Sequence, residues 1–209
     1  IWVSDKTESP ILSMGGDLKA CFSLTAGNRV YLSQYFGDME HYGVARSYER
    51  ELAAMRQIFH LEPKQIVCDL HPGYHTTALA NRMAQERQIP LIQVQHHHAH
   101  IASVMAEYGL TSCIGVAFDG TGYGTDGTVW GGEFFYCKDM EFSRMAHLTP
   151  IPICGGDRSA KDASITAMSY CSAYGASCED SRFSAIQTAI DQNINTIPSS
   201  SMGRLFDAV

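Results

Sequence analysis

The residues of this chain best suited to chemistry are four histidines in the stretch Gln95–His100, namely His96, His97, His98 and His100. A β-leaning apolar run precedes them, and apolar residues at helical spacing follow them. Because His96 and His100 are four residues apart, a helix presents both on one face, where two imidazoles can bind one metal ion. The spacing resembles H-E-x-x-H, but position 97 is His instead of the Glu that a metallopeptidase uses as general base. The pattern favours a metal or phosphate site, and the alternative is a polar helical turn without an ion.

An aspartate followed by a glycine-rich stretch is the second candidate. Cys113–Asp119 has the composition of a buried strand, and the nine residues after it include four glycines. We expect a hairpin in which Gly120, Thr121 and Gly122 hold a phosphate through backbone N–H groups and a hydroxyl. Asp119 is the carboxylate expected to meet a metal directly or through water. The stretch is not a G-x-G-x-x-G fingerprint and lacks a Walker lysine, and a turn needed only for its dihedral angles is the alternative.

A Gly-Gly turn near the start of the chain is the third candidate. Gly15 and Gly16 let the backbone approach an anion closely, and Asp17 and Lys19 can orient a nucleotide or a metal-bound phosphate. A hairpin mouth that faces solvent is the alternative for the same residues. The β-leaning runs 19–25 and 29–34, joined by Ala26-Gly27-Asn28, predict a hairpin directly afterwards.

The elements that must position these residues alternate between helix and strand. Apolar residues recur at helical spacing over residues 42–58 and 76–88, and β-leaning runs cover residues 65–69 and 90–95. This rhythm predicts right-handed crossovers and a largely parallel sheet. Ligands of such sheets bind at the carboxyl ends of the strands, where Asp69, His71 and His96 fall. Further on we expect a strand at 129–137, helices from 160 and at 183–192, and a hydroxyl-capped helix start at Ser199–Arg204.

Composition limits the classes of protein that fit. The 209 residues carry a net charge of −7 without a Lys/Arg-rich run, which disfavours nucleic-acid and anionic-membrane binding. The apolar runs are too short to span a bilayer, and the first residues lack the pattern of a signal peptide. Seven scattered cysteines without a C-x-x-C pair indicate free thiols in the cytoplasm. Because the chain does not begin with Met and stops within an expected helix, we expect it to be part of a longer protein.

Several unusual stretches, in order along the chain, carry a family resemblance. They are MGGDLKACFSL, LSQYFGDME, CDLHPGYHTT, VQHHHAHIASVMAE, AFDGTGYGTDGTVWGGEF, GGDR and SSSMGRLFDAV. On these stretches the chain resembles the HypF carbamoyltransferases of nickel–iron hydrogenase maturation. The resemblance implies a truncated α/β nucleotide-binding fold of the sugar kinase/Hsp70/actin (ribonuclease H-like) class, with a mixed sheet and flanking helices. It implies a first lobe at residues 1–110 that holds the histidines, and a second lobe at residues 111–209 that is incomplete at its C-terminal end.

The resemblance also implies an activity. In the family a YrdC-like domain makes carbamoyl-adenylate from carbamoyl phosphate and ATP, and the domain represented here passes the carbamoyl group to the C-terminal cysteine thiol of the partner HypE. His96 and His100 match the family's two ligands of a divalent metal, iron or zinc, and form the expected catalytic group with Asp119. A third ligand, an aspartate, is expected beyond Val209, and acylphosphatase-like and zinc-finger domains are expected elsewhere in the polypeptide. The expected cofactor-binding residues are Gly15, Gly16, Asp17, Lys19, Gly120, Thr121, Gly122, Gly156, Asp157, Gly203 and Asp207.

Two other functions stay open on these residues. One is metal-dependent O-carbamoyl transfer to a small hydroxyl compound, with the same fold and metal site. The other is a nucleotide- or metal-binding module without catalysis. The Ser-, Ala- and Tyr-rich stretch 169–180 is expected to be an insertion between helices. We expect this chain alone to be inactive, because the third metal ligand and the adenylate-forming domain are expected outside it.

Overall fold

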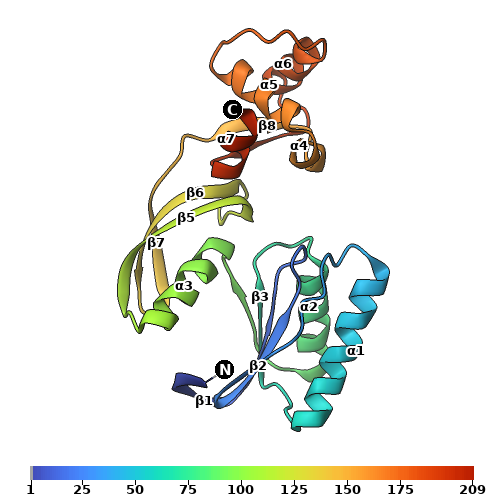
Figure 1. Cartoon of the computed structure of the whole chain (residues 1–209), viewed down its shortest axis with the longest axis vertical. Coiled ribbons are helices and arrows are strands. Elements are labelled where there is room, and N and C mark those ends of the chain that lie inside the picture. Colours follow the sequence, from blue (N-terminus) through green and yellow to red (C-terminus); the bar gives the residue numbers. More distant parts are fainter. Residues whose placement is uncertain (1) are drawn as a thin grey trace. The chain divides into compact units, whose positions relative to one another are not determined.

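The computed structural model describes residues 2–209, apart from the side chains of residues 2–6 and of Asp157. The chain folds into two compact units, one up to Val94 and the other from Gln95 to Val209 (Figure 1). Each unit has its own mixed β-sheet and its own helices.

The first unit is built on a four-stranded sheet in the order β2-β1-β3-β4. Its strands are β1 (Trp2–Met14), β2 (Phe22–Leu32), β3 (Gln65–Asp69) and β4 (Leu91–Val94). β1 and β2 are antiparallel, whereas β1, β3 and β4 are parallel. The parallel arrangement expected from alternating strands and helices is therefore confirmed for these three strands.

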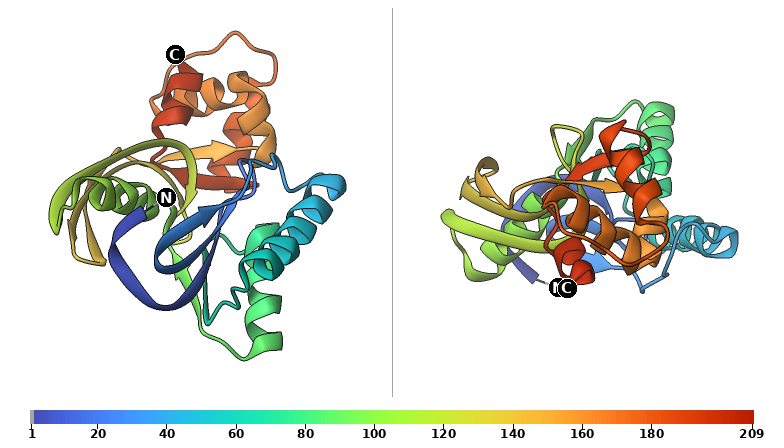
Figure 2. Two further views of the ribbon diagram at one scale, coloured as in Figure 1. Left: turned by 60° about the horizontal axis from the view of Figure 1, so that its bottom comes forward. Right: turned by 90° about the horizontal axis from the view of Figure 1, so that it is seen from above.

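Two helices cover one face of this sheet (Figures 1 and 2). They are α1 (Tyr42–Phe59) and α2 (His75–Arg87), close to the ranges expected from their apolar spacing. Each ends at a residue with left-handed backbone, His60 or Gln88, whose N–H bonds back to the last turn. Leu12, Phe22, Tyr48, Ile66 and Ala80 are fully or almost fully buried between sheet and helices and form the centre of this core.

The prediction of a hairpin turn at Ala26-Gly27-Asn28 is wrong. β2 runs through these residues as one strand and pairs with β1, with register shifts on both sides of Thr7. Gly27 has a φ of 59° and pairs with Thr7, and the extra residues at both shifts in register lie in β1. The connection between the two strands of the hairpin is the loop of residues 15–21. Because a glycine with positive φ serves both turns and bulges, its presence did not distinguish the two.

The second unit holds a five-stranded sheet in which β5, β6, β9 and β8 follow one another and β7 also pairs with β6. Its strands are β5 (Ser112–Tyr123), β6 (Val129–Lys138), β7 (Glu141–His147), β8 (Ile151–Cys154) and β9 (Thr196–Ser199). β5 is longer than expected, because it continues through Gly120–Tyr123 after an irregularity in register that follows Phe118. The tight turn falls at Gly124–Thr128, where Gly124 N–H donates to the Thr128 carbonyl at 2.9 Å.

Helix α3 (His96–Tyr108) packs against β5 and β6. Its Ile101 and Met105 are buried in one cluster with Trp130 and Phe135. Gly115 permits this close approach, because a Cβ on it would lie 2.4 Å from Cδ1 of Ile101. This packing places α3 and its histidines in the compact unit that begins at Gln95, and the lobes expected at residues 1–110 and 111–209 stay a prediction.

The remaining helices of the second unit are α4 (Asp157–Lys161), α5 (Ala163–Ala173), α6 (Phe183–Asp191) and α7 (Met202–Ala208). α5 packs against β8, α6 and α7, and the group is orange to red in Figure 2. The side chain of Ser201 accepts a hydrogen bond from the N–H of Arg204 at 3.0 Å, which confirms the expected hydroxyl cap.

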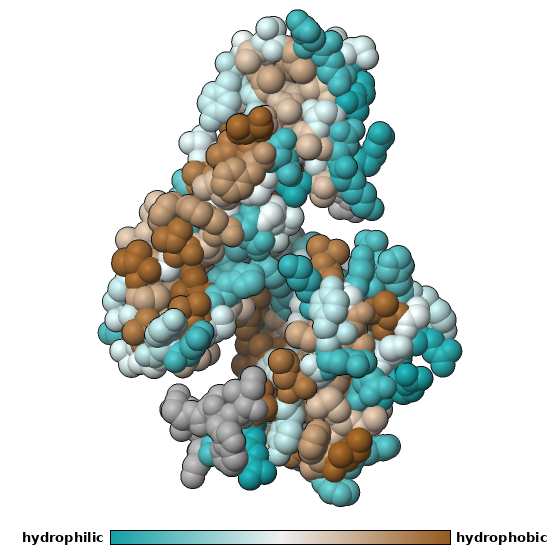
Figure 3. Space-filling view, viewed as in Figure 1, coloured by the Kyte–Doolittle hydropathy of each residue, from teal (hydrophilic) through white to brown (hydrophobic). Residues whose placement is uncertain are grey.

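One face of β5 remains open within the second unit. Ile114, Val116 and Phe118 alternate along the strand and are 71%, 50% and 56% exposed. Figure 3 shows hydrophobic atoms over the part of the second unit that holds β5, β6 and β7. In the described part of the chain, no helix combines the length and apolar character needed to cross a membrane.

Candidate metal centre

The start of α3 arranges its histidines around one helical turn. Gln95 precedes the helix with extended backbone, and its Oε1 accepts a hydrogen bond from the N–H of His98 at 2.9 Å. This side-chain cap fixes where the helix begins. His96 and His100 then project from one face, with ring centroids 4.7 Å apart. The His96 side chain is 25% exposed and that of His100 is 61% exposed, so this face is open to solvent.

Three donor atoms converge at this face. Oδ2 of Asp119 in β5 lies 3.2 Å from Nε2 of His96 and 3.8 Å from Nε2 of His100, and the two Nε2 atoms are 3.2 Å apart. Two ligands about 2.1 Å from one zinc ion, at the tetrahedral angle, are about 3.4 Å apart, so these distances fit ligands of a single ion. Asp119, which the sequence led us to expect near a metal, completes a three-donor cluster among the described residues, and the ligand expected beyond Val209 stays a prediction.

The two oxygens of Asp119 have different environments. Oδ1 accepts a hydrogen bond from the N–H of Gly120 at 2.6 Å. Oδ2 is sealed from solvent and makes no well-aligned hydrogen bond with the described residues. The imidazoles of His96 and His97 hold the pKa of the Asp119 carboxyl well below its usual range, against the opposing effect of burial. The carboxylate is therefore anionic at neutral pH and directs an uncommitted oxygen at the two exposed imidazoles, as a cation site requires.

The other two histidines of the turn face the interior. The His97 side chain is fully buried, and its Nε2 lies 3.5 Å from Oδ2 of Asp119. His98 points into the sheet, where its ring lies 4.5 Å from that of Phe142, and burial lowers the pKa of its imidazole. The contact between His97 and Asp119 was not expected from the sequence. The i,i+4 rule selects His96 and His100 and is silent about the residue between them.

The glycines after Asp119 lie on an extended strand. Gly122 is buried, and a Cβ on it would lie 2.3 Å from Cε1 of His97, so this glycine makes room for the imidazole. Gly120 uses its N–H to bond Asp119, and its neighbour Thr121 is exposed. Their expected role in phosphate binding stays a prediction.

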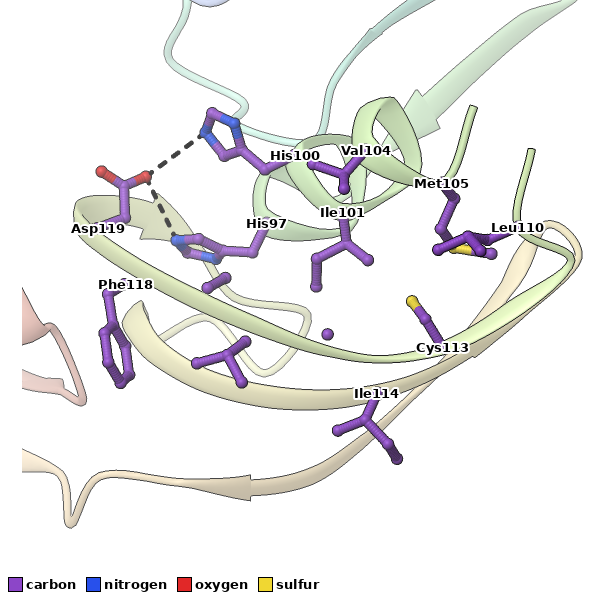
Figure 4. A pocket seen from close by; sticks show the side chains of 13 residues that line it. His97, His100, Ile101, Val104, Met105, Leu110, Cys113, Ile114, Phe118 and Asp119 are labelled. Carbon is purple, nitrogen blue, oxygen red and sulfur yellow. Dashed lines mark ion pairs between the residues drawn. The ribbon is translucent and has the colours of Figure 1, made fainter. Parts of the chain in front are cut away.

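A groove of about 460 Å³ runs along α3 and β5 (Figure 4). His97, His100 and Asp119 line its polar end, and Figure 4 marks the two contacts from these histidines to the carboxylate. The rest of its lining is mostly apolar and includes Ile101 and Val104. A molecule bound at the polar end can therefore extend along an apolar wall.

In the first unit, Asp17 acts on the start of α2. Its Oδ2 accepts a hydrogen bond from the N–H of His75 at 2.7 Å, and its Oδ1 accepts from the N–H and the hydroxyl of Thr76, both at 3.0 Å. Gly15 lies so close to Cys21 that a Cβ would be 2.6 Å from its carbonyl oxygen. Gly16 is half-buried and Lys19 is exposed. Asp17 and Gly15 therefore have structural roles. Cofactor binding by Gly15, Gly16, Asp17 and Lys19 stays a prediction.

The remaining candidate residues lie in the second unit. Gly203 lets α7 approach β5, because a Cβ on it would lie 2.6 Å from Cα of Gly120. Asp207 forms an ion pair with Arg204 at 3.1 Å. Gly156 has a φ of 55° directly before α4, and the side chain of Asp157 lies outside the described residues. The expected role of these residues in nucleotide binding stays a prediction.

Comparison with known proteins identifies the class and then the family. The model described as the HypF Kae1-like domain matches residues 6–107, and the model for the second subdomain of the Kae1-like carbamoyltransferase domain matches residues 115–209. The chain is thus a Kae1-like domain, and it belongs to the HypF family. This confirms the expected α/β fold of the sugar kinase/Hsp70/actin class.

Curated relatives and a solved structure agree with this assignment. The chain is 39% identical over 157 residues to carbamoyltransferase HypF of Synechocystis sp., an alignment covering 74% of this chain and 20% of that protein. It is 35% identical over 206 residues to carbamoyltransferase HypF2 of Cupriavidus necator, covering 95% of this chain and 26% of that protein. A crystal structure of full-length HypF in the phosphate- and nucleotide-bound form matches all of this chain with a TM-score of 0.91 and 38% identity, over 34% of its own length. The chain therefore spans between a fifth and about a third of these relatives.

Proposed function

We propose that this chain is the carbamoyl-transfer domain of a cytoplasmic HypF protein. In this proposal it moves the carbamoyl group of carbamoyl-adenylate, made from carbamoyl phosphate and ATP by a YrdC-like domain of the same polypeptide, to the C-terminal cysteine thiol of HypE. The observation that carries the proposal is the convergence of His96, His100 and Asp119 on one point. Family membership supports the type of reaction, because the relatives are named carbamoyltransferases.

The donor set suits an iron or zinc ion, because two imidazoles and one carboxylate are ligands that both metals accept. When bound, such an ion supplies Lewis acidity that polarises a carbonyl and neutralises the charge of a phosphate leaving group. The three ligands leave at least one coordination position for the substrate, and the exposure of His100 keeps that side open. The anionic state of Asp119 keeps the site ready for a cation at neutral pH.

The nucleotide part of the proposal has separate support. The solved HypF that matches the whole chain is described as phosphate- and nucleotide-bound. A carbamoyl-adenylate carries an anionic phosphate next to a weakly electrophilic carbonyl, so a site for it needs a cation beside the carbonyl. The His/His/Asp cluster meets that need, and the acceptor thiolate comes from the partner protein.

The test replaces both exposed histidines in the full-length protein. His96→Ala/His100→Ala is mixed with carbamoyl phosphate, ATP and HypE, and loading of the HypE cysteine is followed by intact mass. Because a catalytic metal contributes several kcal/mol and about 1.4 kcal/mol corresponds to tenfold in rate, we expect loading to slow by about 100-fold or more. Glu107→Ala on the exposed side of α3 is the control and should load normally. Loading at an unchanged rate in the double variant would contradict the proposal.

A further inference from the structure

We infer that His97 is a positioning residue of the metal centre, whose Nε2–H holds the free oxygen of Asp119 in place and whose tautomer is fixed by Gln95. The inference rests on the metal centre of the proposed function. It adds to that centre a residue that is expected neither to ligate the metal nor to touch the substrate.

The orientation of the Gln95 amide follows from two of its partners. Its Oε1 lies 2.9 Å from the backbone N of His98, which can only donate. Its Nε2 lies 3.2 Å from the carbonyl oxygen of Tyr123, which can only accept. A flipped amide would place donor against donor and acceptor against acceptor. Gln95 is only 3% exposed, so water offers no replacement for these partners.

This orientation determines where His97 carries its proton. The same Nε2 of Gln95 lies 3.1 Å from Nδ1 of His97. An amide nitrogen has two hydrogens and only donates, so one goes to the carbonyl of Tyr123 and the other to this ring nitrogen. Nδ1 of His97 must therefore accept, and the neutral ring has its hydrogen on Nε2.

The proton on Nε2 faces the metal centre. Nε2 of His97 lies 3.5 Å from Oδ2 of Asp119, the oxygen that also lies between His96 and His100. Both atoms are sealed from solvent, and neither makes a well-aligned hydrogen bond with the described residues. Because leaving a buried polar atom without a partner is unfavourable by about 1–3 kcal/mol, a hydrogen bond from Nε2 of His97 to Oδ2 of Asp119 would satisfy both atoms.

The imidazole is held in this pose by packing. It is fully buried and packs on Gly122 of β5, where a Cβ would lie 2.8 Å from its Nε2. Gln95 at the start of α3 and Gly122 in β5 therefore clamp the ring from two elements. Hydrogen-bonding partners that orient a metal ligand in this way typically change metal affinity by about 10- to 100-fold when removed.

Two substitutions of His97 separate its two nitrogens. In His97→Asn the amide reaches the place of Nδ1 and keeps a partner for Gln95, but it does not reach Asp119. In His97→Gln the amide nitrogen takes the place of Nε2 and can still donate to Oδ2 of Asp119. Each full-length variant is titrated with Co²⁺ and followed by visible absorption. The His96→Ala/His100→Ala variant is the blank, and its signal is subtracted to correct for Co²⁺ bound at other sites. His98→Phe is the matched control, because His98 is buried on the same turn and faces Phe142 instead.

We expect His97→Asn to raise the Co²⁺ dissociation constant about 10- to 100-fold, while His97→Gln and His98→Phe stay within about threefold of the wild type. The imidazole ¹⁵N spectrum of histidine-labelled, metal-free protein, assigned by difference from His97→Asn, should show His97 protonated at Nε2. Equal binding by His97→Asn and the wild type, an equal loss in His97→Gln, or a proton on Nδ1 overturns the inference. If the wild type binds no more Co²⁺ than the blank, the result instead contradicts the metal centre itself and the proposed function that depends on it.

Discussion

Both oxygens of the Asp17 carboxylate accept hydrogen bonds from the first residues of α2, unlike those of Asp119. We expect Asp17→Asn to lower the free energy of unfolding by about 1–2 kcal/mol, because it sets an amide hydrogen against the N–H of His75 or Thr76. Denaturant titration measures the change. Asp38→Asn is the control, since among the described residues the Asp38 side chain accepts a hydrogen bond only from the nearby N–H of Glu40, and the change should alter stability by less than about 0.5 kcal/mol. Unchanged stability combined with weaker nucleotide binding in Asp17→Asn would favour the ligand role expected from the sequence.

Glu133 is a carboxylate without any exposed side-chain surface, in β6. It accepts hydrogen bonds from Nε of Arg144 at 2.6 Å, from the hydroxyl of Ser200 and from the N–H of Gly131 at 3.1 Å. Burial alone raises the pKa of this carboxyl, but these hydrogen bonds outweigh burial and hold the pKa below its usual value. We expect Arg144→Met to lower the free energy of unfolding by about 3–5 kcal/mol at neutral pH, because the charge of Glu133 stays buried without its partner.

The same pair predicts a pH dependence. The pKa of Glu133 is lower in the folded chain than in the unfolded one, where it is about 4.3, so the pair stabilises fully above that pH and its contribution is lost as pH falls through the folded pKa. Unfolding free energies between about pH 5 and pH 3 should therefore fall in the wild type, and the deficit of Arg144→Met should shrink as Glu133 becomes protonated. Glu133→Gln, which removes the titrating group, is the reference. A deficit that is constant with pH would mean that this ion pair does not contribute.

At the scale of elements, α3 packs on β5 at two glycines, Gly115 and Gly122, and we expect their substitution to have different effects on metal binding. A Cβ on Gly122 would meet the ring of His97 at 2.3 Å, and a Cβ on Gly115 would meet Ile101 at 2.4 Å. We expect Gly122→Ala and Gly115→Ala each to lower the free energy of unfolding by about 1–3 kcal/mol through overpacking. Only Gly122→Ala should also weaken Co²⁺ binding, because only it displaces a side chain that touches Asp119. Equal metal affinities in the two variants would show that the centre tolerates movement of His97.

The parts of the fold that periodicity determines were predictable, and the parts that depend on distant contacts were not. Helical spacing located α1 and α2, the i,i+4 rule selected His96 and His100, and Asp119 was expected to meet a metal directly or through water. The path of β2 was missed because the continuity of the strand through Gly27 depends on its irregular pairing with β1, which is a distant contact. The role of His97 was missed for the same reason. The burial of His97 depends on the missing Cβ at Gly122, and the position of its ring proton depends on Gln95. Neither contact produces a periodic pattern in the sequence.

At the scale of the whole molecule, the candidate metal centre belongs to one of the two compact units. His96, His100 and Asp119 all follow Gln95, the first residue of the second unit, and α3 and β5 share one hydrophobic cluster. In the structure, the elements that set the donor geometry are α3, β5 and the side chains between them.

This organisation predicts where a bound metal should stabilise the protein. An ion present at 100 times its dissociation constant adds about 2.7 kcal/mol to the stability of whatever unfolds with its site. Hydrogen exchange of the full-length protein, read peptide by peptide with and without Zn²⁺, should therefore slow in α3 and β5 (residues 96–108 and 112–123). The strands β1, β3 and β4 of the first unit should exchange at the same rate in both conditions, because none of them supplies a donor. The His96→Ala/His100→Ala variant should lose the effect entirely, and equal protection of β3 and β5 in the wild type would mean that the metal acts on the two units as a single cooperative structure.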